Sequence, residues 1–351
     1  MSTVRQEART PTSGEVMQRK DAASARVDLL TLPFDQYQRY HIVAKAADSV
    51  RLYLNQPQIR VLDVGGFHLT REGRPFLPVT HFLPSDFTVT TDLADGVPSK
   101  YVRASGASLP FRSEVFDLVV TCDTLEHVPA PSRAAFVEEL LRVATPCVLL
   151  IAPFDSEPTR RAERILRRHL ATRDCTHGPL EEHFERGLPS AGELRAQISV
   201  NGLSFIEFAD GYLPHWLPMM AMQLAHRVTP AFLAELNRFY NRHLSPTDRR
   251  EPAYRRAFVI AQTGHEDLLP PISSAVDPGP AASQLHADIA DDLDSLLKQG
   301  QRDAQDRLAI LEAENDHLMQ VLRGYEQGRL IRLMRWLHQW QERVTGRSSG
   351  I

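Results

Sequence analysis

Six short apolar runs, separated by segments with helical periodicity, constrain the fold of this chain more than any other feature. The runs lie at residues 59–65, 87–93, 116–123, 147–153, 204–210 and 255–263. They do not alternate strictly between apolar and polar residues, so both faces of each strand are expected to be covered. Strands that alternate with helices in this way predict an α/β fold with a mostly parallel sheet between helical layers.

The segments between the runs carry the three- and four-residue spacing of helices with one buried face. Residues 34–54 show it from Ile42 to Leu54, and Pro57 marks the expected end of this helix. Residues 132–144 and 192–202 have the same character, and Gly202 stands where a helix C-cap is expected.

Composition divides the chain into five regions. Residues 1–30 are polar and mixed in charge, which predicts a flexible leader before a domain at 31–264. Pro, Ser, Ala and Gly are frequent in residues 265–283, as is typical of a linker. A coiled coil is predicted at 284–327 and a basic amphipathic tail at 328–351.

The coiled-coil prediction rests on a seam of residues at four- and three-residue steps. The seam consists of Ala304, Leu308, Leu311, Asn315, Leu318, Leu322 and Tyr325. Asn315 falls at an a-type position, which favours a parallel homodimer. The alternative is a single helix that packs back on the domain. Three alternatives are open for the basic tail that follows the coiled coil: contact with an anionic membrane surface, docking onto a partner protein, or simply the end of the helix.

Charge, cysteine content and hydropathy exclude several classes of protein. Lys plus Arg number 40 against 44 Asp plus Glu, so the chain as a whole has no excess of positive charge to attract nucleic acid. The cysteines Cys122, Cys147 and Cys175 lack the spacing of a disulfide framework or a zinc site. Neither a signal peptide nor an apolar run of transmembrane length is recognised. We expect a cytoplasmic protein, with contact to the inner membrane through the tail as the alternative.

Acids and glycines gather at the ends of the first two apolar runs. Asp63, Gly65 and Gly66 end the first run, and Asp92 ends the second, 29 positions after Asp63. Missing side chains let a ligand approach the backbone, and an acid at the tip of the second strand can accept hydrogen bonds from ribose hydroxyls. Phe67 stands where a further glycine would help, within an irregular insertion rich in Gly and Pro.

Four motifs follow one another along the chain: "VLDVGG", the acid of "TTDL", "LPF…FDLVV" and "LEHV". With them, residues 34–263 resemble class I S-adenosylmethionine-dependent methyltransferases of the type-11 group. The resemblance implies a Rossmann-like, doubly wound sheet of seven strands and S-adenosyl-L-methionine as cofactor. It places Asp63, Gly65 and Gly66 at the methionine part and Asp92 at the ribose. It also places Ser105, Gly106 and Ala107 at the adenine, and Asp123 beside the methionine and the transfer site.

Two residues depart from the family pattern. Phe67 replaces a glycine, and Ser105 replaces an acid that contacts the adenine amino group, so a weaker contact with the cofactor is expected. The alternative to an active enzyme is therefore a weak or inactive scaffold with the methyltransferase fold that acts through its coiled coil.

Histidines are the candidate catalytic groups, because an imidazole titrates near neutral pH. His127 follows the fourth strand of the family pattern, and His183 lies with His177, Glu181 and Glu182 between the fifth and sixth strands. The alternatives are that His127 organises its loop and that His183 belongs to a solvated charged loop. The spacing of these residues predicts no metal site.

The acceptor is expected to be a small molecule or a glycan. The combination of this domain with a coil and a basic tail resembles enzymes of bacterial surface-polysaccharide synthesis, which implies O-methylation of a sugar. A quinone or another lipid-linked molecule is the alternative. Residues 210–244 form either core or an acceptor lid with Tyr212, His215, Trp216, Met219 and Met220, and core is favoured.

Overall fold

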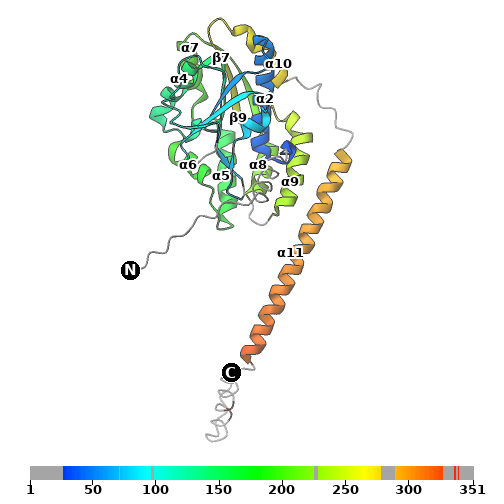
Figure 1. Ribbon diagram of the computed structural model, residues 1–351. Coiled ribbons are helices and arrows are strands. Elements are labelled where there is room, and N and C mark those ends of the chain that lie inside the picture. The colour runs from blue at the N-terminus through cyan, green and yellow to red at the C-terminus, as the bar shows by residue number, and fades with distance from the viewer. Residues whose placement is uncertain are drawn as a thin grey trace, which may run out of the picture.

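The computed structural model describes residues 27–70, 72–95, 99–224, 228–277 and 289–326, together with positions 336 and 339 (Figure 1). Nearly all of the predicted leader, and the predicted tail except for those two positions, lie outside the described residues. Among the described helices, none combines the length and the apolar character needed to cross a membrane.

A seven-stranded sheet organises the domain, as predicted. Its strands are β1 (Arg60–Val64), β4 (Phe87–Asp92), β5 (Tyr101–Arg103), β6 (Phe116–Cys122), β7 (Ala144–Pro153), β8 (Ser204–Tyr212) and β9 (Ala253–Ala261). They are arranged in the order β5-β4-β1-β6-β7-β9-β8. The sheet is mostly parallel, and β9 runs antiparallel to both of its neighbours. Six strands match the apolar runs, whereas the short strand β5 was not predicted.

Helices cover both faces of this sheet (Figure 1). The α-helices of the described residues are α2 (Phe34–Leu54), α3 (Pro78–Phe82), α4 (Arg133–Val143), α5 (Glu157–Ala171), α6 (Gly178–Arg186), α7 (Ala191–Val200), α8 (Leu213–Gln223), α9 (Pro230–Phe239), α10 (Leu269–Val276) and α11 (Ile289–Glu326). A hairpin of β2 (His68–Leu69) and β3 (Pro75–Phe76) occupies the insertion that was expected to be irregular.

Alternate side chains of the strands belong to two separate cores. Val61 and Val120 point to the face that packs against α2 and α10, whereas Leu62 and Val119 point to the face that packs against α4 and α7. Successive side chains of a strand face opposite ways, so a strand covered on both sides must be apolar at almost every position. This explains why β6 is buried along its whole length.

Helix α2 ends at Leu54, three positions before the proline that was expected to stop it. Its stripe of buried residues, from Ile42 to Val50, packs against the sheet. At Asn55 the backbone adopts the left-handed conformation with φ 51°, and its N–H donates to the carbonyls of Arg51 and Leu52. Asn tolerates this conformation, so it closes the helix before Pro57 is reached.

The prediction of a linker is wrong for residues 266–276. Residues 266–276 form η6 (Glu266–Leu268) and α10, and the side chains of Leu268, Ile272 and Val276 are fully buried. Helix α10 packs against α2, so this segment belongs to the core of the domain. Residues 278–283 of the predicted linker lie outside the described residues.

Residues 289–326 form the single long helix α11, which extends away from the domain (Figure 1). Its first part packs on α9, where Gly300 allows close approach, since a Cβ there would lie 3.2 Å from the Phe232 ring. Asp292 accepts hydrogen bonds from Arg242 and His243 at 2.8 and 2.7 Å. Farther along, the seam residues Leu308, Leu311 and Leu318 are exposed. The coiled-coil dimer remains a prediction.

A third apolar cluster lies beyond the sheet, between α5 and α8. Trp216 and Met219, which were favoured as core residues, are 1% and 7% exposed. The Trp216 ring stacks on the Tyr254 ring with 3.5 Å between centroids. This cluster supports the wall of the cavity described next.

Candidate active site

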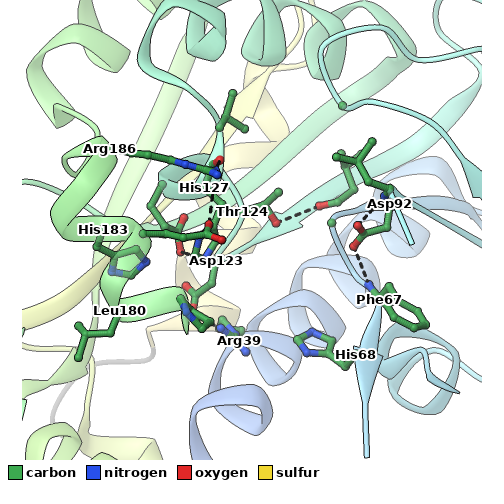
Figure 2. A pocket seen from close by; sticks show the side chains of 18 of the residues that line it. Arg39, Phe67, His68, Asp92, Asp123, Thr124, His127, Leu180, His183 and Arg186 are labelled. Carbon is green, nitrogen blue, oxygen red and sulfur yellow. Dashed lines mark hydrogen bonds and ion pairs between the residues drawn. The ribbon is translucent and has the colours of Figure 1, made fainter. Parts of the chain in front are cut away.

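A cavity of about 960 Å³ opens at the carboxyl ends of β1, β4 and β6 (Figure 2). Strands β4 and β6 flank β1 on opposite sides, so the chain order reverses at this point, where open α/β sheets bind ligands. Asp92 and Phe67 lie at one end of the cavity and His127 and His183 at the other, with Asp123 and Arg39 between them (Figure 2).

The glycine turn after β1 is shaped by the packing around it. Gly65 has φ +81°, and a Cβ there would lie 2.2 Å from the Thr124 hydroxyl oxygen. A Cβ at Gly66 would lie 2.0 Å from an Asp63 carboxylate oxygen. Both positions therefore require glycine. Gly65 lines the cavity as predicted, whereas Gly66 does not reach its wall.

Asp63 was predicted to line the methionine subsite, but it lies beneath the turn. Its side chain is fully buried and accepts a hydrogen bond from the Tyr40 hydroxyl at 2.8 Å. Burial raises the pKa of Asp63 to about 7, although the Tyr40 hydrogen bond acts in the opposite direction. The buried Asp63 side chain therefore packs beneath the glycine turn.

Asp92 lines the cavity and fixes the end of the glycine turn. Its two oxygens accept hydrogen bonds from the backbone N–H of Phe67 at 3.3 Å and of Leu93 at 2.6 Å. The Phe67 ring packs edge-to-face against the Tyr101 ring, with 6.1 Å between centroids. Figure 2 shows this ring pointing away from Asp123 and His127, so Phe67 leaves the middle of the cavity open.

The predicted adenine loop follows β5, and Ser105, Gly106 and Ala107 all line the cavity. The Ser105 hydroxyl accepts a hydrogen bond from the Ala107 N–H at 3.3 Å, which shapes the loop. A Cβ at Gly106 would lie 2.3 Å from the Phe136 ring, so only glycine lets the loop approach α4 this closely.

Asp123 lines the cavity, but two arginines that the sequence reasoning missed hold its carboxylate. Arg255 of β9 donates to both carboxylate oxygens, with Nε at 2.7 and 2.9 Å and Nη2 at 2.7 Å, and Arg39 of α2 also bonds to it. Asp35 lies 3.9 Å from Arg255, so two acids face two arginines. A signal was present in the sequence, because Arg255 begins an otherwise apolar run and Arg39 lies on the apolar side of a predicted helix.

The two candidate catalytic histidines meet at the far end of the cavity, with 5.0 Å between ring centroids (Figure 2). His127 belongs to η2 (Leu125–His127) and His183 to α6, which packs against η2. His183 is 8% exposed, so the alternative of a solvated loop is wrong for this residue. Burial, and next the proximity of His183, lower the pKa of His127.

Carboxylates orient both imidazoles. His127 Nδ1 lies 3.0 Å from a Glu182 oxygen, and His183 Nδ1 lies 2.8 Å from a Glu163 oxygen. Sequence reasoning assigned no role to Glu126, which is 1% exposed and lies beside both histidines. Burial raises the pKa of Glu126 to about 8. Glu181 points elsewhere and pairs with Arg167.

Comparisons with known proteins show that part of the chain is similar to methyltransferases. Residues 85–152, from β4 to β7, match the family model described as "Methyltransferase domain". An uncharacterized methyltransferase of Mycobacterium sp. (strain KMS) is 34% identical over 131 residues, which cover 31% of this chain and 50% of the relative. The chain thus spans about half the length of this curated relative.

Solved structures of methyltransferases are similar to this chain at low sequence identity. The plantazolicin methyltransferase BpumL, in complex with SAH, is 9% identical, with a TM-score of 0.40 and coverage of 72% of this chain and 91% of that chain. Magnesium protoporphyrin IX methyltransferase from Synechocystis PCC 6803, with bound SAH, is 14% identical, with a TM-score of 0.36 and coverage of 72% and 95%. Residues 85–152 are thus similar to a methyltransferase domain, and the sequence motifs and the sheet order agree with the fold of class I S-adenosylmethionine-dependent methyltransferases.

Proposed function

We propose that the protein transfers a methyl group from S-adenosyl-L-methionine to a hydroxyl of a small polar acceptor of the sugar or glycan type. One observation carries the proposal: a single cavity joins the glycine turn and Asp92 to a pair of carboxylate-oriented histidines. One end has the features of a nucleoside site, and the other has groups that can take up a proton.

The residues at the nucleoside end fit the cofactor. Asp92 would accept hydrogen bonds from the ribose, and the loop from Ser105 to Ala107 would border the adenine. Gly65 lines the cavity without a side chain of its own, so a ligand can approach the backbone of the turn closely. The cofactor supplies an activated methyl group on a sulfonium with its own leaving group.

The protein would contribute alignment and removal of a proton. Orientation of the acceptor oxygen toward the methyl carbon is worth about 7–11 kcal/mol in favourable cases. As the oxygen–carbon bond forms, the carbon–sulfur bond breaks and its electron pair stays on the sulfur. The hydroxyl proton would pass to Nε2 of His127 or His183, since each Nδ1 is engaged by a glutamate.

The lining of the acceptor end favours a polar acceptor over a quinone. His177, Glu182 and Arg186 contribute polar groups there, and the Trp216–Tyr254 stack contributes an apolar wall. A sugar carries hydroxyl groups on a ring that also has an apolar face, so it matches such a lining. A labelled-methyl transfer assay on cell extract, followed by mass spectrometry of the product, would identify the acceptor, and a labelled quinone would contradict this assignment.

Asp92→Ala is expected to weaken the binding of S-adenosyl-L-methionine by about 10- to 100-fold, because it removes charge-assisted hydrogen bonds to the ribose. Isothermal titration calorimetry of the full chain measures the effect. Asp95→Ala is the matched control, since Asp95 is 76% exposed and pairs with Arg103 outside the cavity. If the unaltered protein shows no heat at millimolar ligand, the proposal is wrong and the inactive scaffold is the better explanation.

We further propose that α11 forms a parallel homodimer through its seam. Leu311→Glu is expected to convert the dimer to a monomer, because it places a charge at a d-type position. Ile310→Glu is the control, because Ile310 is a neighbouring apolar residue that lies off the seam. The exposed fractions of the two side chains are similar, 59% for Ile310 and 50% for Leu311. Sedimentation equilibrium measures the mass, and equal effects of the two substitutions would contradict the coil.

A further inference from the structure

We infer that Glu126, His127 and His183 form a binding site for a divalent first-row transition-metal ion such as Zn²⁺. The ion would hold the acceptor oxygen at the far end of the cavity. Its role in catalysis rests on the proposed methyl transfer, whereas its binding can be measured independently.

The tertiary structure brings together the ligand types that such an ion uses. One ligand atom from each of the three side chains lies within 4.8 Å of the other two. The set is two imidazoles and one carboxylate, as in catalytic zinc sites and in sites for other first-row metals that keep open positions. Glu126 and His127 come from η2, and His183 comes from α6, which packs against it.

Partner residues engage Nδ1 of each histidine and leave Nε2 available as a ligand. Glu163 accepts from the Tyr254 hydroxyl at 3.0 Å and lies 2.8 Å from His183 Nδ1. Glu182 lies 3.0 Å from His127 Nδ1. A carboxylate accepts hydrogen bonds, so each Nδ1 carries the proton and each Nε2 keeps its lone pair. Metal-binding histidines are commonly held in this way by a carboxylate on the other ring nitrogen.

Two atoms of the cluster are buried and have no hydrogen-bond partner among the described residues: Glu126 Oε2 and His183 Nε2. Their side chains are 1% and 8% exposed. Burying polar atoms without partners is unfavourable, and most buried polar atoms in proteins find one. A cation between Glu126 and the two histidines would satisfy both atoms at once.

The proposed ion would also change how the acceptor loses its proton. Three protein ligands leave positions open for an acceptor oxygen, and a bound Zn²⁺ lowers the pKa of a bound hydroxyl. With the lone pairs of Nε2 on the metal, the hydroxyl proton would pass to water in the cavity. The oxygen then attacks the methyl carbon as before.

Equilibrium dialysis of the full chain against Zn²⁺, with metal analysis by mass spectrometry, tests the site. We expect one ion per chain, and Glu126→Gln and His183→Gln are each expected to weaken binding by at least 100-fold. Glu163→Gln, which alters a partner of His183, is expected to weaken binding by about 10- to 100-fold. His215→Gln is the control, because His215 pairs with Asp248 outside this cluster and should bind Zn²⁺ as the unaltered protein does.

Circular dichroism and calorimetry with S-adenosyl-L-methionine establish that each variant is folded. If one of the two ligand variants fails to fold, the other still decides the result. Less than one ion per chain in the unaltered protein, or undiminished binding in a folded Glu126→Gln or His183→Gln protein, would overturn the inference. Cofactor binding without Zn²⁺ binding would refute only the metal site, whereas Zn²⁺ binding without cofactor binding would refute only the proposed function.

Discussion

Asp123→Ala is expected to lower the free energy of unfolding by about 3–5 kcal/mol, because it removes the closer of the two acids that face the buried Arg255 and Arg39. The side chains of these arginines are only 2% and 5% exposed, so most of their surface is shielded from water. A second cost adds to the first. Asp123 has φ +49°, a conformation that alanine adopts at a penalty of roughly 1–2 kcal/mol. Urea denaturation followed by circular dichroism measures the change.

Two controls separate these effects. Asp123→Asn removes the charge but tolerates the left-handed conformation, so it is expected to be less destabilising than Asp123→Ala by about 1–2 kcal/mol. Asp95→Ala breaks the exposed pair with Arg103 and is expected to cost less than about 1 kcal/mol. If Asp123→Ala is as mild as Asp95→Ala, the ion cluster does not stabilise the domain.

Gly65→Ala is expected to abolish measurable binding of S-adenosyl-L-methionine, with a loss of at least 1000-fold. The new Cβ would overlap the Thr124 side chain, with its nearest atoms at 2.2–2.8 Å, and would also be strained by the positive φ. The turn must move to relieve both, and the backbone that a ligand would approach moves with it. Isothermal titration calorimetry measures the binding, and thermal unfolding shows how much of the loss reflects destabilisation.

Gly73→Ala provides the matched control. Gly73 also has a positive φ, +73°, but nothing lies within 4 Å of the added Cβ. This substitution therefore carries the backbone strain without the clash, and it is expected to cost about 1–2 kcal/mol of stability with cofactor binding unchanged. Equal binding by the two variants would show that the turn after β1 does not contact the cofactor.

The strands were predictable because burial on both faces favours apolar residues at most positions, as in β6 and β7. Strand β5 has only three residues, and none of them is buried, so it left no such signal. Helix α10 was mistaken for linker because its Pro, Ser and Ala resemble one. Its place in the core depends on Ile272 and Val276 meeting α2, which the composition of the segment does not reveal.

Sequence alone indicated six of the seven strands and predicted that Gly65 and Asp92 lie at one site, because Gly65 follows β1 and Asp92 ends β4, and the carboxyl ends of these strands share one edge of the sheet. Only the tertiary structure decided the rest. Asp123 meets Arg39 and Arg255 across 84 and 132 positions of the chain, and His183 meets Glu126 and His127 through the packing of α6 on η2. Such contacts depend on how distant segments lie against one another, whereas residue spacing encodes only what neighbours along one helix or strand share.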